Sequence, residues 1–269
     1  MRLSQNLNTS PKIVLSDFNT RYHIVDNIKY QERFKIRASE VDFQQKATLP
    51  AICDLLQEVA GNHAQKLNFD ITDLQEEKLT WVLHRLFIKI ERYPDWRETI
   101  TIETWPSSGD GLRAYRDFLI KDTEDKIIGR CLSYWLMMNI ESRRPTRIPK
   151  EILEMAPINI DHVLTVNKAN FAEIQNPDNK ISYEVRKTDL DLNQHVNNVR
   201  YVEWALSCLP EKSNIRELDI QFLAESVAGD TDIAAIKEKS DSEDKIYLHK
   251  ITRDSDQEVL ARAQSKLQG

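Results

Sequence analysis

The feature that most constrains the fold is an internal repeat of long period. Residues 34–46 align with residues 183–195, so that Asp42 falls on Asp191 (191 − 42 = 149) and Gln45 falls on Gln194. Residues 120–133 align with residues 252–265 at the shorter offset of 132 (262 − 130 = 132). A period far above the 20–50 residues of solenoid repeats predicts two fused copies of one domain. Chance similarity between strand-rich segments is the alternative.

Each copy shows the same order of elements. In the first, a strand and a turn lead into a helix at 49–67, whose apolar residues recur at helical spacing and whose Pro50 suits a first turn. Four strands follow, at 81–91, 98–105, 114–122 and 126–138. The second copy predicts a strand at 182–187, a helix at 197–209, and strands at 217–224, 232–238, 245–253 and 258–266. A long helix beside an antiparallel meander, twice over, predicts an α+β protein with each sheet wrapped around its helix.

Proline-rich and polar stretches set the predicted domain boundaries. Residues 1–27 are interpreted as a polar N-terminal extension, and residues 28–141 as the N-terminal unit. Residues 142–180 carry four prolines and are interpreted as a linker with one short helix near 150–155. Residues 181–269 then form the C-terminal unit.

Composition excludes several classes of protein. The net charge of −6 argues against a general nucleic-acid binder. No run of 18 apolar residues is present and the first twenty residues lack an apolar core, so neither a membrane span nor a secretory signal is expected. Cys53, Cys131 and Cys208 are too scattered for a disulfide framework or a zinc site. We expect small buried residues there rather than nucleophiles. No glycine-rich phosphate loop and no metal-ligand spacing is present, so neither a nucleotide-cradling loop nor a metal site is expected.

The densest polar chemistry lies in residues 188–198, directly before the second helix. Helix capping explains one or two of these side chains. It does not explain Asp191, Asn193 and His195 at alternating positions, which point the same way if the chain is extended there. His195 is a proton carrier near neutral pH, Asp191 could orient it or act as a base, and Asn193 could fix a water or polarise a carbonyl. The helix that follows offers free N–H groups to a carbonyl oxygen, and Asn197 and Asn198 are candidate substrate-binding residues.

A further acid is a candidate at the end of the strand at 217–224. Glu225 follows this strand, although a solvated strand end is the alternative for Glu225 alone. Counting back by 133 residues assigns Arg92 as its counterpart in the first copy, where Lys46 stands for His195. The first copy therefore lacks both the acid and the histidine. We expect the second copy to carry the chemistry and the first to shape the pocket.

Two other groups of residues allow simpler interpretations. His63 lies among apolar positions of the first helix and is expected to be a hydrogen-bonded core residue. The densest basic cluster is a solvated turn or a docking surface for an acidic partner, and it consists of Arg143, Arg144, Arg147 and Lys150.

Three separated segments together resemble one family, the acyl-acyl carrier protein (ACP) thioesterases of plants and bacteria, over roughly residues 30–268. They are residues 189–201 (DLDLNQHVNNVRY), residues 92–96 (RYPDW), and residues 133–139 (SYWLMMN) with the downstream Arg143-Arg144 and Ile148-Pro149. The resemblance implies a double hotdog fold, in which two fused units each wrap an antiparallel sheet around a long helix. It also implies release of free fatty acid from acyl-ACP without a cofactor.

The resemblance also implies residue roles. The family's catalytic Asp, Asn and His fall on Asp191, Asn193 and His195, and its catalytic Glu falls on Glu225. This chain has Ser226 where plant members often have cysteine, which favours water activated by a carboxylate over a cysteine nucleophile. Plant members carry a transit peptide, and none is evident here, so a bacterial cytoplasmic enzyme is expected.

The acyl tail is expected in the N-terminal unit, against the helix at 49–67 and the strand near 81–90. An acyl-CoA thioesterase of the same fold is the nearest alternative, and a non-catalytic acyl-binding protein is a more distant one. Exposed sheet edges also make a homodimer a candidate assembly.

Overall fold

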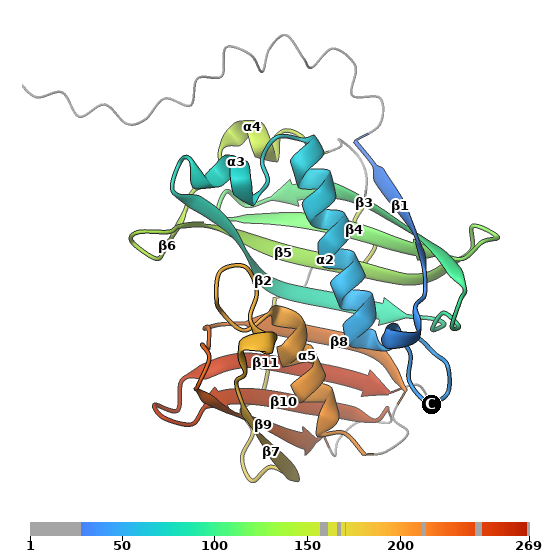
Figure 1. The fold of residues 1–269 in the computed structure, drawn as a ribbon, viewed down its shortest axis with the longest axis vertical. Coiled ribbons are helices and arrows are strands. Elements are labelled where there is room, and N and C mark those ends of the chain that lie inside the picture. Colours follow the sequence, from blue (N-terminus) through green and yellow to red (C-terminus); the bar gives the residue numbers. More distant parts are fainter. Residues whose placement is uncertain are drawn as a thin grey trace, which may run out of the picture.

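The structure, a computed structural model, describes residues 28–156, 161–165, 168–169, 171–210, 214–239 and 244–267. The predicted N-terminal extension at 1–27 lies outside these residues. Within them the chain forms one eleven-stranded sheet with two main helices on its inner face (Figure 1). No helix in the described ranges is long and apolar enough to cross a membrane.

The N-terminal unit wraps its sheet around helix α2 (Leu49–Lys66), which begins at Thr48, whose hydroxyl accepts the N–H of Ala51. The buried face of α2 includes Ile52, Leu56 and Val59, which join the main hydrophobic core under the sheet. The strands run in the order β1-β3-β4-β5-β2. Their bounds are β1 (Tyr30–Lys35), β2 (Leu79–Ile90), β3 (Thr99–Gly109), β4 (Arg113–Lys121) and β5 (Ile127–Asn139).

The C-terminal unit repeats this arrangement around the shorter helix α5 (Asn198–Ser207). Its strands run in the order β7-β9-β10-β11-β8, which is the same order shifted by one copy. Their bounds are β7 (Asn179–Glu184), β8 (Ile215–Phe222), β9 (Thr231–Glu238), β10 (Ile246–Arg253) and β11 (Val259–Leu267). The α+β double hotdog expected from the sequence is confirmed.

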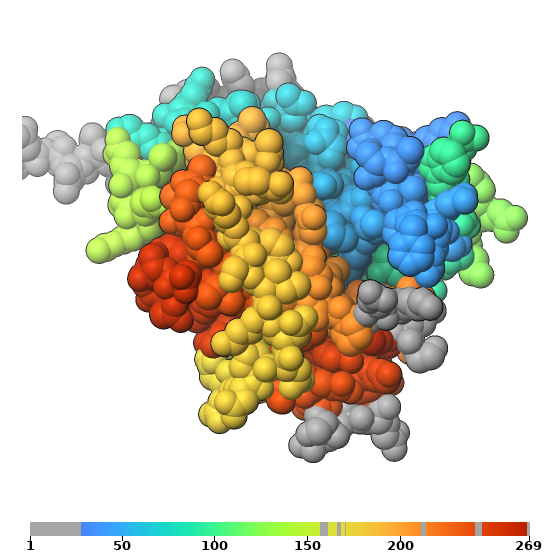
Figure 2. Space-filling view, turned by 60° about the horizontal axis from the view of Figure 1, so that its bottom comes forward, coloured from blue at the N-terminus to red at the C-terminus, as the bar shows by residue number. Residues whose placement is uncertain are grey.

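Strands β2 and β8 pair antiparallel and join the two sheets into one. Arg85 of β2 makes a two-pronged ion pair with Asp219 of β8, through Nε (2.7 Å) and Nη2 (2.6 Å), and its side chain is only 6% exposed. Further along the same strand pair, Lys89 and Glu217 approach to 3.3 Å and are more exposed. Figure 2 shows the orange and red C-terminal unit packed directly against the blue and cyan segments of the N-terminal unit.

The structure contains two short elements that the sequence did not predict, and both lie in stretches between the longer helices and strands. Helix α3 (Ile71–Gln75) and strand β6 (Arg144–Thr146) were not predicted, because both are too short to show a period. The short helix predicted near 150–155 is present as α4 (Lys150–Leu153). β6 and α4 lie within the range interpreted as a linker, and β6 pairs with β5.

Two expectations about core residues are confirmed. Cys53, Cys131 and Cys208 are all buried and unpaired, and burial raises the pKa of the Cys208 thiol to about 11. His63 is buried as well, and its Nδ1 lies 2.9 Å from a guanidinium nitrogen of Arg116.

Candidate active site

The 188–198 segment is a tight turn rather than an extended strand. The Oδ1 atom of Asp191 accepts the backbone N–H of Asn193 (2.8 Å) and of His195 (3.2 Å), and Gln194 takes a left-handed φ of 63°. The expectation that alternating side chains share one face of an extended chain was therefore wrong. The turn, wound around one carboxylate, brings these residues to the same place.

The same turn exists in the first copy, 149 residues earlier. Asp42 Oδ1 accepts the N–H of Gln44 (2.8 Å) and of Lys46 (3.0 Å), and Gln45 has a φ of 62°. The first copy has no histidine at this turn and yet keeps the aspartate. The two backbone bonds that hold the turn are therefore a sufficient role for the Oδ1 atom of Asp191.

Glu225 and His195 meet beside this turn. The Nε2 atom of His195 lies 3.2 Å from Oε2 of Glu225. A backbone bond from the N–H of Val196 to the carbonyl of Ser226 (2.9 Å) ties the two segments together. The side chains of His195 and Glu225 are 25% and 39% exposed, so water can reach the pair. The geometry places a proton carrier and a carboxylate within reach of one another and of solvent.

The counterpart of Glu225 in the first copy needs a correction of one residue. In the second copy the N–H groups of residues 223 and 224 both point to the carbonyl of Leu260, and in the first copy those of residues 91 and 92 both point to Ile128. Ala224 therefore corresponds to Arg92, and Glu225 corresponds to Tyr93. The offset of 133 was wrong because the strands keep the offset of 132 to their ends. The first copy still lacks the acid.

Asn197 and Asn198 stand at the start of α5. Asn197 caps the helix, since its Oδ1 accepts the N–H of Val199 at 3.0 Å. Asn198 is the first helical residue, and both asparagines line the cavity described below. In the described part of the chain the side chain of Asn193 makes no hydrogen bond, so its amide is available to a ligand.

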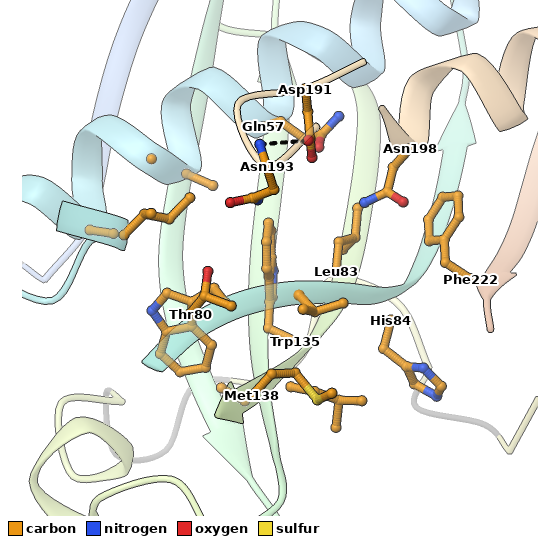
Figure 3. A pocket seen from close by; sticks show the side chains of 18 of the residues that line it. Gln57, Thr80, Leu83, His84, Trp135, Met138, Asp191, Asn193, Asn198 and Phe222 are labelled. Atoms are coloured by element: carbon orange, nitrogen blue, oxygen red, sulfur yellow. Dashed lines mark hydrogen bonds between the residues drawn. The ribbon is translucent and has the colours of Figure 1, made fainter. Parts of the chain in front are cut away.

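A cavity of about 1280 Å³ connects this turn to the interior of the N-terminal unit. Asp191, Asn193, His195 and Glu225 all line it. Figure 3 shows Asn193 and Asp191 beside Gln57 of α2, with Trp135 below them. The remaining wall is largely apolar and comes from α2, β2, β5 and neighbouring loops, including Ala60, Phe69, Trp81, Leu83, Trp135 and Met138. A polar entrance that opens into an apolar space is suited to a molecule with a reactive head and an apolar tail.

Ser226 does not face this cavity. Its side chain is fully buried, and its Oγ donates to Oδ1 of Asp232 at 2.8 Å, while its backbone N–H donates to the hydroxyl of Tyr201 at 3.0 Å. Burial raises the pKa of Asp232 to about 6. Ser226 is thus a buried hydrogen-bond donor beside Glu225, in a poor position to act as a nucleophile.

The predicted basic cluster divides in the structure. Arg143 lines the cavity, and its Nη2 donates to Oε2 of Glu225. Arg144 is exposed, and Lys150 pairs with Glu154 at 3.0 Å. Sequence reasoning missed the contact of Arg143 with Glu225, because no local pattern reports a pairing across 82 residues. Gln57 was also missed, because it is one of several polar residues on α2 and nothing in the sequence marks it as lining the cavity.

Comparison with known proteins identifies relatives over most of the chain. Residues 27–156 match the family model of the acyl-ACP thioesterase N-terminal domain, and residues 172–268 match that of the C-terminal domain. An oleoyl-ACP thioesterase of Coriandrum sativum is 35% identical over 205 residues, which cover 70% of this chain and 55% of that protein. A dodecanoyl-ACP hydrolase of Cinnamomum camphora is 33% identical over 217 residues, which cover 73% and 56%. The chain thus spans about half the length of these plant relatives.

Solved structures agree in fold over nearly the whole chain. An acyl-ACP thioesterase from Bacteroides thetaiotaomicron superposes with a TM-score of 0.78 and 26% identity, covering 89% of this chain and 98% of that one. The 12:0-ACP thioesterase of Umbellularia californica superposes with a TM-score of 0.79 and 25% identity, covering 90% and 94%.

Proposed function

Because this chain belongs to the acyl-ACP thioesterase family, we propose that it hydrolyses the thioester of acyl-ACP to free fatty acid and ACP. Such a release ends the elongation of the acyl chain and so terminates fatty acid synthesis. The observation that supports this best is the shared cavity, which joins the His195–Glu225 pair to an apolar space in the other unit. The reactive group would lie at the entrance, with the tail along α2 and β2.

In the proposed mechanism Glu225 accepts a proton from a water molecule, whose oxygen attacks the thioester carbonyl carbon. The side-chain N–H of Asn193 and the positive end of the α5 helix dipole stabilise the negative oxygen that forms, since the N–H groups of Val199 and Arg200 are already bonded to Asn197. The carbon–sulfur bond then breaks, and the proton passes from Glu225 through His195 to the leaving thiolate. The 3.2 Å contact between Glu225 and His195 is the path for this proton. Asp191 holds the turn that carries Asn193 and His195.

Replacing Asp191 with alanine is expected to lower kcat at least about tenfold, since small misplacements of reacting groups are costly. The variant loses the acceptor of two backbone N–H groups, and both Asn193 and His195 lie on that turn. Asp42→Ala is the matched control, because it removes the same two bonds from the twin turn. Steady-state hydrolysis and thermal unfolding of both variants provide the test. Equal losses of kcat in the two variants would contradict the assigned role.

Gly61 of α2 offers a test of where the acyl tail lies. It is an exposed residue that lines the cavity, and a Cβ atom added there meets no atom within 4 Å. A leucine at this helical position should fold at least as well as glycine, because glycine is disfavoured in helices by about 1 kcal/mol. Gly61→Leu is expected to shift the preference towards shorter acyl chains, with each excluded methylene costing about 10- to 200-fold in kcat/KM. A panel of acyl-ACPs measures the shift, with Gly61→Ala as control. An unchanged preference would place the tail elsewhere.

The group that carries the acyl chain, ACP or CoA, distinguishes this proposal from the nearest alternative, an acyl-CoA thioesterase. We propose that the exposed basic residues Arg144, Arg147 and Lys150 contribute to docking of the acidic carrier protein. Comparing kcat/KM for acyl-ACP and acyl-CoA with the same acyl chain tests the choice. A strong preference for acyl-ACP supports the proposal, and activity on acyl-CoA alone overturns it. Binding of either thioester without hydrolysis would favour an acyl-binding protein.

Two finer expectations remain proposals. A homodimer could form through β1 or β7, which end the sheet on either side, and sedimentation analysis would show it. We also propose a cytoplasmic location, and fractionation of cells that produce the full-length protein tests it.

A further inference from the structure

The turn between β5 of the N-terminal unit and β6 places one side chain against the carboxylate of Glu225 in the C-terminal unit. Nη2 of Arg143 donates to Oε2 of Glu225. The turn that carries Arg143 is itself fixed, because the N–H of Arg143 donates to the carbonyl of Asn139 at 2.9 Å and the N–H of Ser142 donates to the Asn139 side chain at 2.8 Å. Arg143 therefore reaches Glu225 from an anchored position.

The contacts of Glu225 are divided unequally between its two carboxylate oxygens. Oε2 receives both Nη2 of Arg143 and Nε2 of His195. Within the described residues Oε1 has no hydrogen-bond partner. The backbone carbonyl of Glu225 in addition accepts from Nη2 of Arg253. The side chain is thus held through Oε2, and Glu225 is one of the residues that line the cavity.

We propose that Arg143 is a positioning residue for Glu225, whose carboxylate it holds towards the attacking water while Oε2 stays in contact with His195. This inference rests on the proposed hydrolysis, and it gives Arg143 a role other than docking of the carrier. A guanidinium holds a carboxylate in a defined orientation through directional, charge-assisted bonds. The catalytic site is then complete only when both units are present and in register.

A substrate without the carrier protein distinguishes positioning from docking. A docking residue affects acyl-ACP alone, mainly through KM, whereas a positioning residue affects acyl-pantetheine as well, mainly through kcat. Arg143 is 68% exposed, and exposed ion pairs contribute little to stability, so its variants should fold.

The first experiment measures hydrolysis of acyl-ACP and of the matching acyl-pantetheine by Arg143→Ala, Arg143→Lys and Lys78→Ala. Arg143→Ala is expected to lower kcat about 10- to 100-fold on both substrates, with little change in KM for acyl-pantetheine. Arg143→Lys should recover part of the loss, since lysine keeps the charge but lacks the planar fork. Lys78→Ala is the control: it removes an exposed ion pair with Glu141 (2.6 Å) on the same turn and should not change turnover. A loss confined to acyl-ACP and to KM would overturn the inference.

A second measurement does not depend on turnover. The 13C carboxyl resonance of Glu225, assigned by its absence in Glu225→Gln, should move in Arg143→Ala and stay in place in Lys78→Ala. An unchanged resonance in Arg143→Ala would overturn the inference even if hydrolysis is observed. Conversely, a wild-type protein that hydrolyses neither thioester but shows the shift would refute the proposed function and leave the contact between Arg143 and Glu225 established.

Discussion

Glu225→Gln is expected to lower kcat for acyl-ACP hydrolysis about 10²- to 10⁴-fold, the usual contribution of a general base. Glutamine keeps the size of the side chain and its capacity to accept from Arg143, but it cannot take a proton from water. The variant also loses the path by which a proton passes from residue 225 to His195, whose Nε2 lies 3.2 Å from Oε2 in the wild type. KM is expected to change little, because the tail binds in the other unit. Release of free fatty acid under saturating acyl-ACP measures the effect.

Ser226→Ala is the matched control for the neighbouring residue. Its hydroxyl is buried against Asp232 and does not face the cavity, so turnover should be largely kept. The variant should instead lose stability, by about 1–3 kcal/mol, because an acceptor of the buried Asp232 is left unpaired. A loss of turnover in Ser226→Ala as large as that in Glu225→Gln would point to Ser226 as a nucleophile and contradict the mechanism.

Asp219→Ala is expected to reduce the free energy of unfolding by about 3–5 kcal/mol, because the buried guanidinium of Arg85 loses its two-pronged ion pair with Asp219. This pair crosses the junction of β2 and β8, where the two sheets become one. Chemical denaturation of the variant and of the wild type gives the difference.

Glu217→Ala tests whether the effect of Asp219→Ala comes from burial or merely from the loss of an ion pair. Glu217 pairs with Lys89 across the same two strands, but both side chains are more exposed, so a cost of about 0–1 kcal/mol is expected. The double variant Arg85→Met/Asp219→Leu should recover much of the stability lost in Asp219→Ala, since no charge remains buried. Equal costs for Asp219→Ala and Glu217→Ala would contradict the account of the junction.

Much of the fold could be predicted from periodicity. The apolar spacing of residues 49–67 predicted α2 to within a residue of its end, and the repeat predicted a second copy whose strands occur in the same order. The pairing of β2 with β8 could not be predicted. The alternation of apolar and polar residues indicates which face of a strand is buried, but it does not indicate which strand pairs with it.

The sequence predicted that four of the candidate site residues lie together, but it did not predict their geometry. Asp191, Asn193, His195 and Glu225 do line one cavity. Their alternation suggested an extended strand, whereas the carboxylate of Asp191 winds the chain into a turn through bonds to its own backbone.

The side-chain contacts between the two units were also not predicted from the sequence. Arg143 was assigned to a solvated turn or a docking surface for an acidic partner, and the structure places its guanidinium on Glu225. Such a pairing depends on how the two units meet, which local sequence does not encode.

The most direct test of the central claim is the release of free fatty acid and of the ACP thiol from a panel of acyl-ACPs, with wild type and Glu225→Gln measured side by side. We expect wild type to release both products in equal amounts over many turnovers, and the variant to be nearly inactive. Release that is as fast in Glu225→Gln as in wild type would place the chemistry elsewhere, and no release by wild type from any acyl-ACP would contradict the proposed function.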